Sequence, residues 1–277
     1  MDNFGLTQVG IRCPLSGIAM FDYPGSADLG SITILVSVGC LAGFLNTIAG
    51  GGSMLSLPTL LFLEVPSAVA NGTNRIAIIA QALPAAIVYF RKGFRDIGQS
   101  VLLSILLLPG SILGAYVGTQ IEDKTFDRIV ATILAITAIS TFFGKVDKDS
   151  ECEKAAHDTI KRRHLVYPLV FLLGFYGGFI HIGIGFLIIF ILHKIGGLSL
   201  VATNTHKILI VVPYSVASLL IFWGEVSVLW YAGISLALGT MFGGWVGAHV
   251  TIKEGGKYIA PFYRATILAM VVILVVR

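Results

Sequence analysis

Charged side chains are scarce in this chain of 277 residues, since Asp, Glu, Lys and Arg together make up only 12% of it. Soluble proteins carry roughly 25% charged residues, so the composition excludes an ordinary soluble protein. Hydrophobic residues make up 56% of the chain instead, and apolar runs extend from about residue 29 to the end. We therefore predict an integral membrane protein, with no room for a sizeable soluble domain.

Motifs for catalysis and metal binding are also missing. The three cysteines, Cys13, Cys40 and Cys152, lie too far apart for a metal or redox motif. The glycines of AGGGS, residues 49–53, are not followed by the lysine of a phosphate-binding loop, and no nucleophile elbow is present. We expect no enzyme activity, no catalytic residues, no metal and no cofactor.

A cleavable signal peptide is not predicted either, because the first 27 residues lack a basic region followed by an apolar one. Residues 1–28 are expected to form a short leader outside the cytoplasm. The net charge of +4 is carried by Lys and Arg residues in the short segments between apolar runs. Basic residues in such loops orient a membrane protein, so the expected partner is the lipid bilayer and not nucleic acid.

Ten apolar segments are predicted, bounded by charges or by Gly and Pro clusters. A bilayer core of roughly 30 Å needs about 20 helical residues, and most segments are long enough to cross it. Two segments would span only about 16 Å, and each follows a glycine-rich break. These short segments are 53–63 and 183–193. The others are 29–48, 72–90, 97–120, 126–143, 165–181, 204–222, 227–249 and 258–276.

The two halves of the chain resemble one another in three blocks whose order and spacing match, so we infer an internal duplication. In the last pair of blocks glycine recurs at every fourth residue, which predicts close helix packing in lipid. The pairs are GFLNTIAGGGSM (43–54) with GFYGGFIHIGIGF (174–186), VANGTNRIAII (69–79) with VATNTHKILIV (201–211), and GSILGAYVGTQI (110–121) with GTMFGGWVGAHV (239–250).

Basic residues predict how the halves are oriented. Arg91, Lys92 and Arg95 mark one loop as cytoplasmic, and six basic residues mark the central loop. Each half is then expected to cross the membrane an odd number of times. The second half would therefore have the opposite orientation in the membrane to the first. The predicted fold is all-α: a polytopic membrane helical bundle of two inverted repeats of about five segments each, with short broken helices. Its parts are a first repeat at 29–144, a cytoplasmic linker at 145–164 and a second repeat at 165–277.

Inverted repeats with short, glycine-interrupted segments indicate a substrate site near the middle of the bilayer. In the first break Asn46 and Thr47 precede the glycines, and His181 lies in the matching break. These side chains could line a cavity or could make structural hydrogen bonds, and both alternatives stay open. The candidate binding residues in and near the breaks are Asn46, Gly50, Gly51, Gly52, Gln81 and His181.

A polar cluster opens the helix that follows each short segment. Asn and Thr are common N-caps, so capping alone would explain several of these residues. A cation at a helix N-terminus, however, meets the positive end of the dipole and costs about 3 kcal/mol inside a membrane. A bound anion would relieve both penalties at Arg75 and Lys207; the alternative is that they reach headgroups or pair with an acid such as Glu64. The clusters supply the candidates Asn71, Thr73, Asn74, Arg75, Asn204, Thr205, His206 and Lys207.

The stretch GFLNTIAGGGSMLSLPTLLFL followed by VANGTNRIAIIAQALPAAIVYFRKG resembles the TauE/SafE family, the sulfite exporter family. The resemblance extends over about residues 30–276. It implies a multi-pass permease for small sulfur-containing or carboxylated anions, such as sulfite or sulfoacetate. The second half matches less closely, because HIGIG keeps two glycines and His206-Lys207 replaces Asn-Arg. The motifs fall on Asn46, Gly50, Gly51, Gly52 and Pro58, and on Asn71, Thr73, Asn74 and Arg75.

We therefore expect a transporter of the inner or plasma membrane that moves a small anion by alternating access. Export is suggested by the family name alone. An anion channel is the nearest alternative, and a membrane-embedded enzyme or a structural assembly protein is a more distant one. Coupling to protons through His181 or His206 is a further hypothesis, because imidazole titrates near neutral pH.

Overall fold

The computed structural model describes residues 28–48, 50–93, 96–143 and 159–254, and within them all regular secondary structure is helical. The predicted all-α class is therefore confirmed. The elements are α1 (Leu29–Ile48), α2 (Ser53–Phe62), α3 (Ser67–Arg91), α4 (Ile97–Gln120), α5 (Asp123–Phe143), α6 (Arg163–Phe179), α7 (Ile184–Ile189), a π-helical turn (Phe190–Ile195), α8 (Leu200–Glu225) and α9 (Trp230–Glu254).

Four of the described helices are long and apolar enough to cross a membrane: α1, α3, α4 and α8. The fold is thus a polytopic membrane bundle. The predicted segments match the helices closely at α1, α2 and α4, while the predicted segment 258–276 lies outside the described residues. The short segment 183–193 was predicted as one helix but is α7 followed directly by the π-helical turn.

The starts of α3 and α8 differ from the prediction by four or five residues. α3 begins at Ser67 directly after Pro66, and the Ser67 backbone N–H donates to Asp123 of α5 at 2.9 Å. α8 begins after Ser199, whose hydroxyl accepts from the backbone N–H of Ala202 at 3.2 Å, as a Ser N-cap does. Both polar clusters therefore lie inside helices, beyond the first turn.

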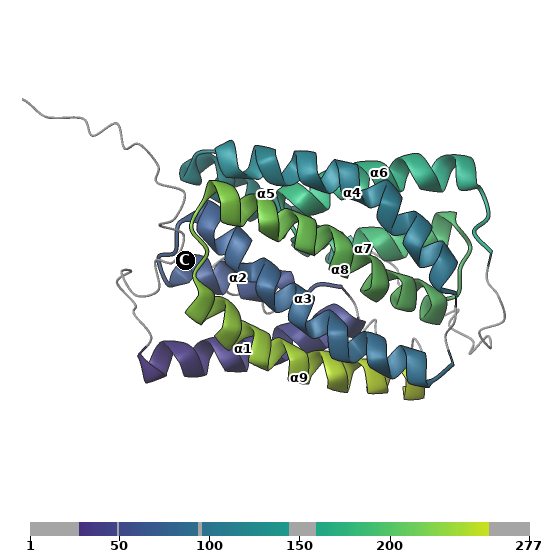
Figure 1. Ribbon diagram of the computed structural model, residues 1–277, viewed down its shortest axis with the longest axis horizontal. Helices are drawn as coiled ribbons and strands as arrows, with labels where there is room; N and C mark the ends of the chain where they lie inside the picture. Colours follow the sequence, from purple (N-terminus) through teal and green to yellow (C-terminus); the bar gives the residue numbers. More distant parts are fainter. Residues whose placement is uncertain (1–27, 49, 94–95, 144–158, 255–277) are drawn as a thin grey trace, which may run out of the picture.

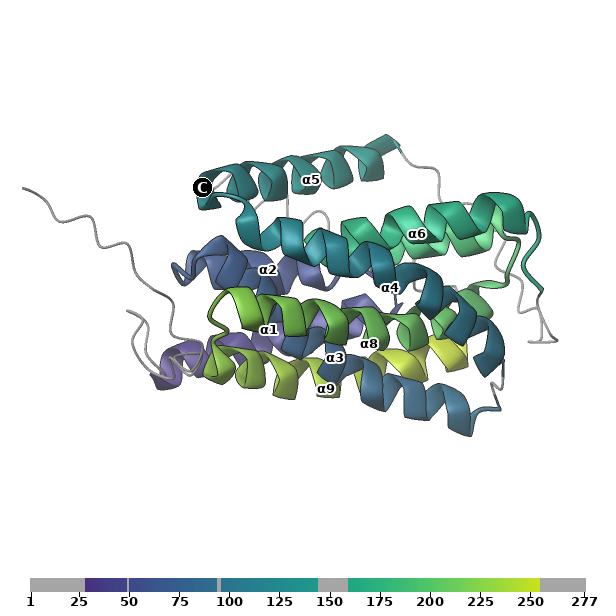
Figure 2. The same ribbon diagram turned by 45° about the horizontal axis from the view of Figure 1, so that its top comes forward.

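Two pairs of helices form the outer layers of the bundle, with α3 and α8 between them (Figure 1). α1 packs along α9, and α4 packs along α6. Between the layers, α3 contacts α9 and α8 contacts α4, while α3 and α8 also contact each other. Figure 2 shows α5 at the margin of the bundle. These main contacts are preserved when α1, α3 and α4 are exchanged for α6, α8 and α9.

Glycines allow the helices of each outer pair to approach closely. A Cβ on Gly239 or Gly243 of α9 would run into the backbone of α1, and one on Gly110 or Gly114 of α4 would run into the backbone of α6. The predicted glycine faces are thereby confirmed. Such contacts bring backbones together by van der Waals packing where lipid offers no hydrophobic driving force.

Candidate functional site

The two broken helices end next to each other in the interior. α1 ends at Ile48 and α6 ends at Phe179. Gly50, which has a φ of +88°, packs against the backbone of Gly185, so the two breaks touch backbone to backbone. The Ser53 hydroxyl at the start of α2 also donates to the carbonyl oxygen of His181 at 2.9 Å.

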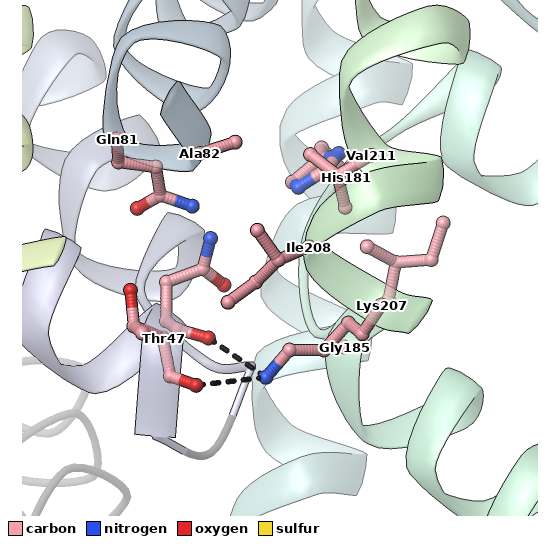
Figure 3. A pocket seen from close by; sticks show the side chains of 10 residues that line it. Thr47, Gln81, Ala82, His181, Gly185, Lys207, Ile208 and Val211 are labelled. Atoms are coloured by element: carbon pink, nitrogen blue, oxygen red, sulfur yellow. Dashed lines mark hydrogen bonds between the residues drawn. The ribbon is translucent and has the colours of Figure 1, made fainter. Parts of the chain in front are cut away.

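The C-terminal carbonyls of α1 are bound by side chains of α8. Lys207 Nζ donates to the carbonyl oxygens of Asn46 at 3.0 Å and Thr47 at 3.1 Å (Figure 3). Asn204 Nδ2 donates to the carbonyl of Ile48 at 3.3 Å. These carbonyls have no partner within their own helix, so α8 caps the end of α1.

The C-terminal carbonyls of α6 are bound in the same way by side chains of α3. The Arg75 guanidinium donates to the carbonyl oxygens of Gly177 at 2.6 Å and Gly178 at 2.8 Å. Asn71 Nδ2 donates to the carbonyl of Phe179 at 2.8 Å. Each half of the chain therefore supplies one cation and one amide that cap the broken helix of the other half.

This arrangement corrects two interpretations of the polar clusters. Arg75 and Lys207 do not stand at the positive end of their own helices; each meets the negative, C-terminal end of another helix, where a cation is favoured. Glu64, the suggested acid partner, is exposed on the loop after α2, whereas Arg75 is fully buried. The N-cap interpretation of the Asn and Thr residues is also wrong, because the caps of α3 and α8 are Pro66 and Ser199.

The site carries excess positive charge. Arg75 is 0% exposed and Lys207 is 3% exposed, and in the described part of the chain no Asp or Glu is buried. Each helix end supplies only about half an elementary negative charge. Two buried cations facing two helix ends therefore leave roughly one positive charge in the interior.

A small cavity adjoins the end of α1. The centre of a water-sized sphere can move within a volume of about 10 Å³ in this cavity. This is about the room that one water molecule needs. Apolar side chains of α3, α7 and α8 form part of its wall, and Figure 3 shows polar groups on several sides. The lining residues are Asn46, Thr47, Gln81, Ala82, His181, Ile184, Gly185, Lys207, Ile208 and Val211.

Four of the predicted binding residues line this cavity, namely Asn46, Gln81, His181 and Lys207, and Thr47 also does. The apolar part of the wall, which α7 and α8 supply, was not predicted. In the sequence, apolar residues that line a cavity look the same as apolar residues of a packed core. Arg75 and Asn71 lie outside the lining, at the end of α6.

The remaining predicted residues do not line the cavity. The hydroxyl of Thr73 accepts from the backbone N–H of Leu229 at 3.0 Å, and the hydroxyl of Thr205 donates within α8. His206 Nδ1 lies 2.7 Å from the hydroxyl of Ser100. The side-chain amide of Asn74 is buried and has no hydrogen-bond partner among the described residues. Gly50, Gly51, Gly52 and Asn204 lie at the breaks, where the glycines allow close packing and Asn204 caps α1.

Comparison with known proteins agrees with this architecture. The model of the family described as "Sulfite exporter TauE/SafE" matches residues 35–276. The chain belongs to this family.

Similar proteins include a "Probable membrane transporter protein ORF9" from Sinorhizobium sp., which is 25% identical over 84% of this chain and 87% of its own length. A "Probable membrane transporter protein" from Haemophilus influenzae is 28% identical over 83% of this chain and 89% of its own length.

A further relative is the "Probable membrane transporter protein YfcA" of Escherichia coli, which is 25% identical over 82% of this chain and 83% of its own length. No solved structure matches the chain. Membership of the TauE/SafE family, together with the membrane-length helices, identifies the chain as a membrane transporter and not an enzyme.

Proposed function

We propose that this TauE/SafE protein transports a small sulfur-containing or carboxylated anion, such as sulfite or sulfoacetate, by alternating access. The observation that carries the proposal is the buried cation Lys207, which is only partly balanced by the end of α1 and lies at the wall of a cavity. A charge is retained in a membrane interior only at a cost, and residues of this kind mark substrate or ion pathways. An anion in the cavity would balance the excess positive charge.

Lys207 would link anion binding to movement of the protein. Its ammonium group has three donors, of which two are used by the carbonyls of Asn46 and Thr47. The third donor is available to a solute oxygen. An anion that draws Lys207 toward itself would weaken the cap on α1 and so loosen the end of that broken helix.

The cavity holds about one water molecule's worth of space, so an oxyanion would have to displace side chains or a helix end to enter. A cavity that must open before a solute can bind favours a transporter with alternating states over a continuously open channel. The two outer helix pairs, α1 with α9 and α4 with α6, are the units that would move against each other.

The orientation of the protein forms part of the proposal. The two halves would be inverted repeats related by an axis in the membrane plane, which is the arrangement of many alternating-access transporters. The repeated contact pattern between the halves supports this. The loop after α3 and the predicted linker at residues 145–164 would face the cytoplasm of an inner or plasma membrane. Export is proposed from the family description alone.

Flux measurements in proteoliposomes test the proposal. We expect the protein to transport at least one of the anions sulfite, sulfoacetate and acetate. The transport should saturate with concentration, and it should show counter-flow. Lys207→Met should weaken apparent affinity about 10- to 100-fold, because hydrogen bonds to charged groups contribute about 1.5–3 kcal/mol. Lys92→Met, which removes an exposed lysine at the end of α3, is the matched control and should transport normally. Single-channel currents in planar bilayers would instead support a channel, and no flux of any of these anions would contradict the proposal.

A further inference from the structure

His181 is a buried histidine that faces both a cation and the cavity. It lies in the link between α6 and α7 and is only 1% exposed. Its Nδ1 atom lies 3.4 Å from Arg75 Nη1 and 2.9 Å from the hydroxyl of Tyr214. Its ring also lines the cavity that adjoins Lys207 (Figure 3).

The contact with Arg75 determines which ring nitrogen carries the proton. A guanidinium group has five N–H donors and no acceptor, and the nearer Tyr214 hydroxyl can also donate, so an Nδ1 that accepts satisfies both contacts. A neutral imidazole then carries its single proton on Nε2. Protonating Nδ1 as well would direct an N–H of an imidazolium at the Arg75 cation, which is unfavourable in a buried site.

The other ring nitrogen is left without a partner. His181 Nε2 is buried and makes no hydrogen bond to any group in the described part of the chain. A buried donor without an acceptor is costly and rare in native proteins. Because the ring forms part of the cavity wall, a solute oxygen in the cavity would supply the missing acceptor.

We propose that His181 is a permanently neutral hydrogen-bond donor to the transported anion, and that Arg75 is the positioning residue that fixes its Nε2–H tautomer. The inference rests on the proposed function and deepens it. His181 and Lys207 then present only N–H groups to the solute. The site accepts solutes that offer oxygen acceptors and discriminates against ammonium-bearing zwitterions such as taurine, which bring a second set of donors and a positive charge.

The same geometry removes His181 as the proton carrier of the cycle. The ionisable groups that face it are Arg75 from α3, Tyr176 from α6, and Tyr214 and Lys207 from α8. In the described part of the chain no carboxylate is buried that could stabilise an imidazolium. Transport is therefore expected to show no step that follows titration of this residue.

Nitrogen-15 NMR of histidine-labelled, full-length protein tests the tautomer independently of transport. His181→Gln identifies the resonances of this residue by their loss. We expect a neutral Nε2–H tautomer from about pH 5 to pH 8, the range in which an ordinary histidine changes charge. A neutral Nδ1–H form, or an imidazolium within that range, would overturn the inference. Tyr214→Phe keeps Arg75 in place and should leave the tautomer unchanged.

Flux in proteoliposomes tests the donor role. His181→Phe retains a flat ring without a donor and should reduce the apparent affinity for the anion about tenfold. His181→Gln places an amide N–H close to the Nε2 position and should recover part of that loss, while Phe and Gln variants with equal affinity would refute the donor role. Should the wild-type protein move no anion, the proposed function fails, whereas the NMR result still decides the tautomer.

Discussion

The two helix breaks are built alike but differ in what their capping cation can do. At the end of α6, the terminal nitrogens of Arg75 donate to two carbonyls and to Asn71, and one of them lies 3.4 Å from His181 Nδ1, so that in the described part of the chain only Nε is without a partner. At the end of α1, Lys207 donates to two carbonyls and has a third donor with no hydrogen bond to the described residues. The planar guanidinium group of arginine suits a contact whose geometry is fixed. The compact ammonium group of lysine suits a contact in which one hydrogen-bond partner is exchanged for another.

The last residues of α1 line the cavity, whereas the last residues of α6 do not, for a related reason. The α1 end carries the side chains of Asn46 and Thr47, and both line the cavity. The corresponding residues at the α6 end are Gly177 and Gly178, and Gly178 packs against the backbone of Ser111 in α4. The end of α6 is therefore closed by helix packing, and the end of α1 keeps polar groups around a small space. Under the proposed function, the end of α6 is structural and the end of α1 binds the solute.

Arg75→Met should have the largest effect on stability. It leaves two carbonyls at the end of α6 and the side-chain oxygen of Asn71 without this donor, and each buried acceptor left unpaired costs about 1–3 kcal/mol. Lys207→Met should lower the free energy of unfolding by less, about 1–3 kcal/mol, because only the carbonyls of Asn46 and Thr47 lose their capping group. Thermal unfolding in detergent micelles compares the two variants. If both variants lost the same amount of stability, Arg75 and Lys207 would not differ as caps in the way described.

Gly50→Ala and Gly183→Ala compare the backbones of the breaks. Both glycines have positive φ, +88° and +67°, where an L-residue is strained by about 1–2 kcal/mol. At Gly50 the new methyl group would also meet the backbone of Gly185, whereas at Gly183 it would meet the flexible end of the Met54 side chain. We therefore expect Gly50→Ala to lower the unfolding temperature clearly more than Gly183→Ala.

Gly93→Ala provides a control for strain alone. Gly93 has a φ of +93°, and a Cβ there would have no neighbour within 4 Å. Its unfolding temperature should fall by about as much as that of the Gly183 variant. If Gly50→Ala were no worse than Gly93→Ala, the close contact between the breaks would not matter for stability.

Asn71→Ala and Asn204→Ala should have the smallest effects, and that of Asn71→Ala should be only slightly larger, because Asn71 Oδ1 also accepts a long hydrogen bond from Arg75 at 3.3 Å. Each change removes one amide that donates to the last carbonyl of a broken helix, Phe179 or Ile48. The loss of one such hydrogen bond contributes about 1 kcal/mol. The unfolding temperatures of the two variants check this, and a marked difference between them would show that the amides are not equivalent caps.

Much of the fold follows from local sequence, whereas the caps do not. Apolar length predicted α1, α2 and α4 almost to the residue, and glycine spacing predicted the close helix pairs. The capping partners are 102 residues apart for Arg75 and Gly177 and 161 residues apart for Lys207 and Asn46, so only the folded chain brings them together.

One pattern could have pointed to the caps from sequence. A broken helix leaves carbonyls that favour a nearby cation, and each half contains one break and one cation in an apolar stretch. The polar clusters obscured this, because Asn and Thr beside an apolar run are typical of an N-cap. The true starts of the helices, after Pro66 and at Ser199, lie a few residues earlier.

The central claim is that Lys207, only partly balanced by the end of α1, is the charge that binds the anion. Anion-dependent thermal stabilisation of the purified protein tests it most directly, with sulfite, sulfoacetate and acetate compared on the wild type, Lys207→Met and the exposed control Lys92→Met. We predict that at least one anion raises the unfolding temperature of the wild type and of Lys92→Met and leaves folded Lys207→Met unchanged. An equal rise in Lys207→Met, or no rise in the wild type with any of these anions, would contradict the claim.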